Sequence, residues 1–274
     1  MKHSPERRNG ARERLQGLDS LRGLTLVSMI LYHAMWDLLY LPEAGAAGAA
    51  LRPWYEGTAG RLWQQSICRT FIFLSGFCVP LSVRIFRRGL LTSCAGLAVS
   101  AVTILAMYEE RIVFGILTFL GAAMLLCGAA GLHRTERWNA QRGKRIPPAP
   151  ACAVCLILFY MTRWVNRGTL RLWPGRTVPL PQALSAGGPA GVLLTALGFP
   201  MPGFFSTDYF SLFPWIFLFC AGTFLHLMLR EKHADLFSHP LLHLRIPVLD
   251  WMGRHSLFIY LLHQPVLYLA VLLL

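Results

Sequence analysis

The sequence predicts an all-α membrane protein, a polytopic helix bundle that crosses the bilayer about seven times. Composition is the first reason: of the 274 residues, 55% are hydrophobic and only 14% are charged, whereas a soluble domain carries about 25% charged residues. The second is a mean hydropathy of +0.48. The third is the grouping of the apolar residues into runs that are long enough to cross a hydrocarbon core as helices.

Seven apolar runs are expected to span the membrane, and the basic segment before them is expected to be cytoplasmic and uncleaved. Residues 1–21 form that segment, and residues 22–274 then make one transmembrane domain. Residues 183–200 are apolar but rich in Gly and Pro, which is typical of a re-entrant or surface segment. The expected spans are about 22–41, 66–86, 90–108, 112–132, 151–165, 209–229 and 255–274.

The net charge of +13 predicts an orientation. In a soluble protein it would indicate nucleic-acid binding, but these cations lie between apolar runs, so the positive-inside rule applies and no nucleic acid is expected. Most of the 26 Lys and Arg are cytoplasmic if the N-terminus is inside. Residues 163–181 are the exception, because they place four Arg outside; if the fifth run does not cross, everything after it inverts. Cys152 and Cys155 form a CxxC, but no second pair follows, so no zinc site is expected and the seven Cys are interpreted as small core residues.

The first span carries three ionisable residues on one helix face. Arg22 and His33 are eleven residues apart, which is three turns plus about 20° and a rise of about 16 Å. Asp37 follows His33 by one turn, so the two can hydrogen-bond and the carboxylate can fix the imidazole tautomer. That arrangement favours a general base. The alternative is that His33 and Asp37 only tie helices together.

Three further groups lie in or next to the first two spans. Asp19 and Arg22 are interpreted as an interfacial pair or a helix-start cap. Ser75 and the Gly after it favour close helix packing over catalysis. Three arginines end the second span and serve either as topology signals or as ligands for a phosphate-bearing molecule; they are Arg84, Arg87 and Arg88.

The last span places Ser256, Tyr260 and His263 on one face, followed by Gln264 and a Pro that interrupts the helix. A structural hydrogen bond and a site role are weighed equally for His263. Asp208 opens the sixth span, where it either caps that helix or faces an outer acceptor. The other histidines are interpreted as ordinary surface residues: His3, His133, His226, His233, His239 and His243.

Five blocks in order carry a resemblance to a known family. They are LDSLRG with YHAMWDL, FIFLSGFCVPLS, FGILTFLGAAMLL, DYFSLFPWIFLFCAG and GRHSLFIYLLHQPVLY. The chain resembles the heparan-α-glucosaminide N-acetyltransferase catalytic-domain family, in particular its small bacterial members, formerly a domain of unknown function. Arg22, ten residues and then His33 also match the spacing of the acyltransferase-3 branch of the transmembrane acyltransferase superfamily.

The resemblance implies that an acyl group, usually acetyl, passes from cytoplasmic acyl-CoA (acetyl-CoA) to an extracytoplasmic glycan or glycolipid. It implies a multi-pass protein of the bacterial inner membrane. By motif, His33 is the catalytic His and Asp37 completes an HxxxD pattern. Arg22 lies near the CoA phosphates, together with Arg84, Arg87, Arg88 and Arg254.

One block departs from the family pattern, because FGIL is followed by Thr118 where relatives have His. Two alternatives to an acyltransferase therefore stay open. One is a proton-coupled permease that uses His33 and Asp37, although no inverted repeat is visible. The other is a non-catalytic membrane protein that retains the fold.

Overall fold

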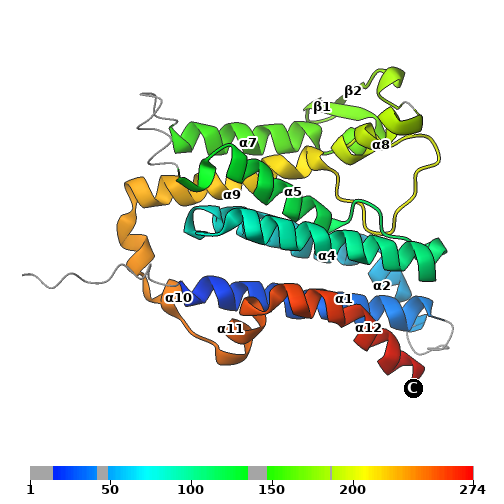
Figure 1. The fold of residues 1–274 in the computed structure, drawn as a ribbon, viewed down its shortest axis with the longest axis horizontal. Helices are drawn as coiled ribbons and strands as arrows, with labels where there is room; N and C mark the ends of the chain where they lie inside the picture. Colours follow the sequence, from blue (N-terminus) through cyan, green and yellow to red (C-terminus); the bar gives the residue numbers. More distant parts are fainter. Residues whose placement is uncertain (1–14, 42–48, 135–146, 186, 274) are drawn as a thin grey trace, which may run out of the picture.

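The computed structural model describes residues 15–41, 49–134, 147–185 and 187–273. The chain is mostly helical, and several of its helices run along the long axis of the molecule (Figure 1). The longer helices are α1 (Gln16–Tyr40), α3 (Thr58–Phe77), α4 (Ile85–Ala106), α5 (Ile116–Ala129), α7 (Pro148–Thr162), α9 (Leu212–Lys232) and α12 (Ser256–Leu272). The shorter ones are α2 (Arg52–Glu56), α8 (Gly188–Leu197), α10 (Pro240–His243) and α11 (Pro247–Arg254).

Each of the seven expected spans overlaps one of the longer helices, but fewer are clear membrane spans. Within the described residues, three helices are long and apolar enough to cross a bilayer, namely α4, α7 with its extension to Arg167, and α9. A fourth crossing is possible if α11 and α12, bent by 93°, act as one span. Helices α1 and α3 have 25 and 20 residues but carry ionisable side chains, and α5 has only 14 residues. Seven crossings therefore stay a prediction.

A short hairpin departs from the all-α expectation. Strands β1 (Thr169–Trp173) and β2 (Arg176–Pro179) pair antiparallel directly after α7. The turn between them is Pro174–Gly175, and Gly175 adopts φ +82, a conformation that glycine reaches without steric cost. Within the Gly- and Pro-rich stretch 183–200, the structure contains α8, a surface helix of 10 residues.

Glycines let the backbones of α3 and α9 approach closely. A Cβ on Gly76 would overlap the carbonyl of Phe219, and one on Gly222 would overlap that of Phe73. Thr223 Oγ1 donates a hydrogen bond to the Gly76 carbonyl at 2.9 Å. The packing interpretation of this segment is thus confirmed for Gly76. The neighbouring Ser75 is half-buried and forms no side-chain hydrogen bond within the described residues.

The protein has a core between α3, α5 and α9, while other helix surfaces face outward. Ile72, Phe119 and Phe219 are buried in that core. Helices α4 and α7 are only 11% and 17% buried over their most apolar windows, so their exposed apolar faces fit a lipid environment. His226 of α9 was expected at the surface, and that expectation is wrong: it is 0% exposed and stacks between Phe77 and Phe237. His226 is buried because it lies within the apolar sequence of α9, on a helix that packs into the core.

Candidate functional site

Two imidazoles meet where α1 packs against α12. The ring centroids of His33 and His263 are 4.8 Å apart, with the rings nearly perpendicular at 77°. In each ring Nδ1 lies at hydrogen-bond distance from a carbonyl of its own helix, Met29 O at 2.9 Å and Tyr260 O at 2.6 Å. Because a carbonyl only accepts, Nδ1 carries the proton in both rings. The lone pair of each neutral imidazole is therefore on Nε2.

The Asp37 carboxylate belongs to the same cluster but has a different partner from the expected one. Asp37 is 0% exposed, and its Oδ1 accepts a hydrogen bond from Gln264 Nε2 at 2.8 Å. A hydrogen bond from His33 was expected, and the structure contradicts it. The His33 ring bends back toward the preceding turn, as side chains on helices do, and uses Nδ1 on the backbone there.

Three buried atoms of this cluster have no hydrogen-bond partner among the described residues. They are Asp37 Oδ2, Gln264 Oε1 and His263 Nε2. With Nδ1 of His263 protonated, all three are acceptors. Buried polar atoms in proteins nearly always find partners, so this cluster is suited to a ligand that brings N–H or O–H donors.

Asp208 lies beside the imidazole cluster. It caps α5 and not α9, the helix of the sixth expected span. Its carboxylate accepts a hydrogen bond from the backbone N–H of Ile116 at 3.1 Å, which is the first residue of α5. The expectation that Asp208 caps the sixth span is therefore wrong. Asp208 lies close enough to His33 and Tyr260 to interact with both electrostatically, so loop 198–211 brings a carboxylate close to the helix pair that carries the imidazoles.

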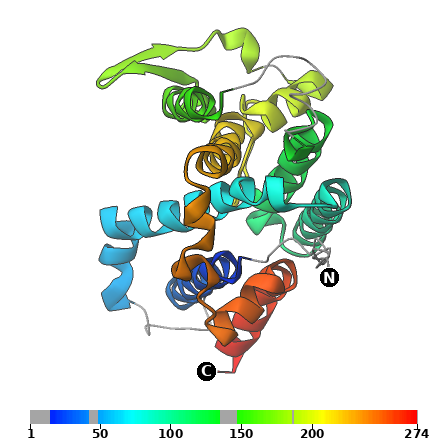
Figure 2. The same cartoon turned by 90° about the vertical axis from the view of Figure 1, so that its left-hand side faces the viewer.

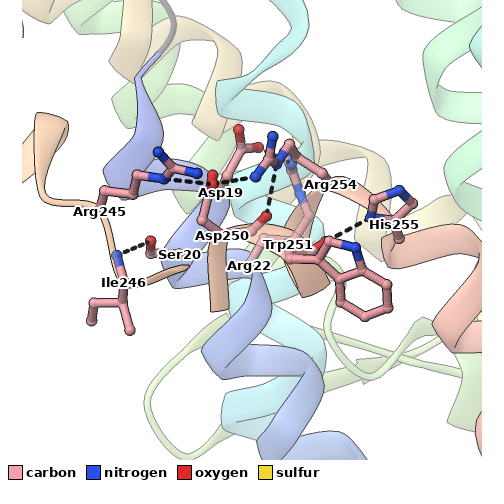
Figure 3. A network of polar contacts seen from close by, with 9 residues as sticks. All are labelled: Asp19, Ser20, Arg22, Arg245, Ile246, Asp250, Trp251, Arg254 and His255. Atoms are coloured by element: carbon pink, nitrogen blue, oxygen red, sulfur yellow. Dashed lines mark hydrogen bonds and ion pairs between the residues drawn. The ribbon is translucent and has the colours of Figure 1, made fainter. Parts of the chain in front are cut away.

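A network of charged residues lies at the other end of α1 (Figure 3). Arg22 Nη1 donates to Asp19 Oδ1 at 3.0 Å, and Nη2 contacts Cys78 Sγ at 3.2 Å. Asp250 is 2% exposed. Arg254 donates to its carboxylate at 2.6 Å, and Arg245 lies 3.5 Å from the same oxygen. We call these five residues the paired cluster: Asp19, Arg22, Arg245, Asp250 and Arg254.

Two glycines hold α11 against α1 and so assemble the paired cluster. A Cβ on Gly23 would overlap the carbonyl of Leu249, and one on Gly253 would overlap that of Asp19. Asp19 and Arg22 were expected to form either an interfacial pair or a helix-start cap, and the structure shows the pair. Sequence reasoning missed Asp250 as the shared acceptor of two arginines. The available signal was its position one turn before Arg254, the spacing at which helix side chains pair.

A family comparison shows which proteins the chain is related to. The family model described as heparan-alpha-glucosaminide N-acetyltransferase, catalytic, matches residues 14–265. The chain belongs to this acetyltransferase family. The match spans both the imidazole pair and the paired cluster, and it confirms the resemblance carried by the five sequence blocks. Searches of curated proteins and of solved structures found no match.

The remaining arginines expected at the donor site of this transferase family lie at the start of α4. All three are exposed. Arg88 and Arg22 both act electrostatically on the Cys78 thiol, so these two arginines share one end of the bundle. The side chains of Arg84 and Arg87 form no hydrogen bond or ion pair with the described residues. The structure therefore joins Arg22 and Arg254 in one network and leaves Arg84 and Arg87 on the nearby surface.

Thr118, the departure from the family pattern, does not lie in the imidazole cluster. It packs where α5 crosses α4, and a Cβ on Gly96 would lie 2.6 Å from the Thr118 hydroxyl oxygen. This hydroxyl is buried without a hydrogen-bond partner in the described residues. A His at residue 118 would have to fit between the closely packed backbones of α4 and α5. The smaller Thr118 side chain is compatible with this close packing.

Proposed function

We propose that this protein is a seven-crossing acetyltransferase of the bacterial inner membrane with a cytoplasmic N-terminus. It transfers an acetyl group from cytoplasmic acetyl-CoA to a hydroxyl or amine of an extracytoplasmic glycan or glycolipid. Membership of the acetyltransferase family supports the reaction class. The observation that carries the proposal is the His33–His263 pair, because both Nδ1 protons are fixed by backbone carbonyls and both Nε2 atoms are free to act as bases.

Acetyl-CoA is polyanionic, and the charge of the paired cluster supports binding of its phosphates there. The cluster holds three Arg and two Asp, which leaves an excess positive charge. Each guanidinium has five N–H donors, and the bonds to Asp19 and Asp250 use only part of them. Arg22 is about 16 Å from His33 along α1, a separation that the extended pantetheine arm would bridge.

His33 Nε2 would act at the thioester. In a direct transfer it takes the proton of the acceptor hydroxyl or amine while the acceptor attacks the acetyl carbonyl. The C–S bond breaks, and the CoA thiolate leaves and is protonated. In a two-step transfer Nε2 attacks the carbonyl itself, CoA leaves, and the acceptor then attacks the acetylimidazole. Mass spectrometry of the protein after acetyl-CoA addition distinguishes the routes, because only the second adds an acetyl group to His33.

The unpartnered acceptors beside the imidazoles support a polyhydroxylated or amino-bearing acceptor. Asp37 Oδ2 and Gln264 Oε1 come from two different helices and share one hydrogen-bonded unit. Sugar hydroxyls and amines supply the donors that these oxygens lack. The Gln264 amide would hold the Asp37 carboxylate in position while a sugar donor group binds Oδ2.

The experiment that tests the proposal compares His33→Ala with His233→Ala in the full-length protein. His233 is an exposed histidine outside the cluster, so it controls for loss of any imidazole. The assay measures CoA release from acetyl-CoA and transfer of radiolabelled acetyl to glucosamine. His33→Ala should lower the rate by about 10²- to 10⁴-fold without lowering the melting temperature. Full activity in His33→Ala would contradict the mechanism, and no turnover in wild type would favour the non-catalytic alternative that Thr118 raises.

A further inference from the structure

A second group of arginines gathers where α7 ends and the hairpin begins. Arg163 lies close enough to three other guanidinium groups to be repelled by them. We call the four arginines, together with the two aromatic side chains that Arg163, Arg167 and Arg171 contact, the unpaired cluster: Arg69, Arg163, Arg167, Arg171, Tyr160 and Trp164. Figure 1 places the hairpin at the end of the molecule opposite to α10 and α11, so this cluster and the paired cluster occupy different ends.

Aromatic faces contact Arg163, Arg167 and Arg171 in place of carboxylates, and Arg69 Nη2 donates to Gln65 Oε1 at 3.1 Å. The Arg167 guanidinium carbon lies 4.3 Å from the Trp164 ring centroid, and that of Arg171 lies 5.5 Å away. Arg171 Nη1 also donates to the Tyr160 hydroxyl at 3.4 Å. No carboxylate of the described residues pairs with any of the four arginines. Cation–π contacts orient guanidinium groups but leave their charge uncompensated.

The cluster also contains buried donors without acceptors. Arg69 Nε, Arg171 Nε and Trp164 Nε1 are all inaccessible to water and lack a hydrogen-bond partner among the described residues. All three are N–H donors. Repelling cations and unsatisfied donors in one place are the features that an oxyanion, such as a phosphate, would relieve together.

Membrane topology alone does not explain this charge. Helix α7 with its extension to Arg167 is long and apolar enough to cross the bilayer, so only one of its ends can be cytoplasmic. Both ends are basic, because Arg137, Arg142, Lys144 and Arg145 precede it and the unpaired cluster follows it. The positive-inside rule accounts for one basic end in either orientation. The other end must have a different role.

An apolar cleft adjoins the cluster and indicates what carries the anion. The cleft has a volume of about 400 Å³ and opens to the surface between α1, α3 and α9. Arg69 lines it together with Phe73 and Phe77, which follow at one-turn spacing on α3. Leu218 and Leu225 of α9 complete the wall. A hydrocarbon surface that ends at a half-buried cation is complementary to an amphiphile with an anionic head.

We propose that the unpaired cluster binds the phosphate of a lipid, with the hydrocarbon chain of that lipid in the adjoining cleft. The phosphate oxygens accept hydrogen bonds from Arg69, Arg171 and Trp164 and neutralise the arginines. This site is separate from the His33 cluster, and its occupancy does not depend on the acetyl-transfer proposal.

The test measures binding to the full-length protein in a neutral detergent, by the shift in melting temperature with probe concentration. The probes are dioctanoyl phosphatidate, its uncharged counterpart dioctanoylglycerol, and inorganic phosphate. The variants are Arg167→Gln/Arg171→Gln and the single change Arg163→Gln at an exposed side chain. The matched control is Arg176→Gln, because Arg176 lies exposed on the same hairpin without an aromatic contact to the cluster.

The proposal predicts that dioctanoyl phosphatidate stabilises wild type and Arg176→Gln equally. The double variant should bind it at least about tenfold more weakly, because the charge-assisted bond from Arg171 and the positive charge of Arg167 are lost, and Arg163→Gln should show a smaller loss. Dioctanoylglycerol should not bind measurably. Equal affinity of the double variant and Arg176→Gln would overturn the proposal. Inorganic phosphate binding as tightly as phosphatidate would overturn the assignment to a lipid.

Discussion

The paired and unpaired clusters both concentrate arginine, but different groups balance their charge. In the paired cluster, Asp19 and Asp250 hold Arg22, Arg245 and Arg254 at ion-pair distances. In the unpaired cluster, Trp164 and Tyr160 contact three of the four guanidiniums and no carboxylate of the described chain takes part. In the first arrangement two carboxylates of the fold compensate most of the arginine charge, whereas in the second no carboxylate of the described residues does so. Substitutions in the two clusters should therefore change stability in opposite directions.

The largest effect is expected from separating α1 and α11, which breaks the paired cluster as a unit. Gly253→Ala places a methyl group onto the Asp19 carbonyl, and overpacking of this kind costs about 3 kcal/mol of unfolding free energy or more when backbone must move. Gly187→Ala is the control, because nothing lies within 4 Å of a Cβ at that residue. Denaturant titration in detergent measures both. Equal stability of the two variants would show that α11 does not depend on this contact.

A smaller loss is expected from removing only the shared carboxylate charge. Asp250→Asn leaves Arg245 and Arg254 without their counter-ion, and breaking a buried ion pair costs about 3–5 kcal/mol. The side chains of Arg245 and Arg254 are 57% and 34% exposed, so solvent reduces the expected loss to about 2 kcal/mol. The exposed Asp235→Asn is the matched control. An unchanged unfolding free energy in Asp250→Asn would show that carboxylate pairing does not stabilise the paired cluster.

The smallest effect, and the one of opposite sign, is expected in the unpaired cluster. In neutral detergent without anionic lipid, Arg167→Gln removes one repelling charge and should raise the unfolding free energy by about 0.5 kcal/mol. Added NaCl should stabilise wild type more than Arg167→Gln, because salt screens repulsion between exposed charges. Thermal unfolding at low and high salt measures both quantities. A loss of stability in Arg167→Gln would mean that its stacking on Trp164 outweighs the repulsion.

Local sequence spacing predicted the helices and the polar faces within them, but not the contacts between distant helices. The placement of Arg22, His33 and Asp37 on α1 follows from helical periodicity. The partner of Asp37 is Gln264, which lies 227 residues along the chain, so spacing within α1 cannot identify it. Asp208 likewise caps α5 from 92 residues away. Such partners depend on how α12 and loop 198–211 pack.

The hairpin was missed for a different reason. Residues 169–179 alternate apolar and polar side chains around Pro174–Gly175, which is a hairpin signal. Residues 163–181 lie between two expected spans, and the sequence analysis predicts only an outer segment there, with no strand. The hairpin brings Arg171 back onto Tyr160 and Trp164, which is the contact that assembles the unpaired cluster.

The most direct test of the account is the melting temperature of the purified protein with and without acetyl-CoA, for wild type, Arg22→Gln and Arg167→Gln. A ligand that binds only the folded state at 100 times its Kd stabilises by about 2.7 kcal/mol. Acetyl-CoA should raise the melting temperature of wild type and Arg167→Gln alike, and Arg22→Gln should lose most of the rise. No rise in wild type at millimolar acetyl-CoA, or an undiminished rise in Arg22→Gln, would contradict a donor site at the paired cluster.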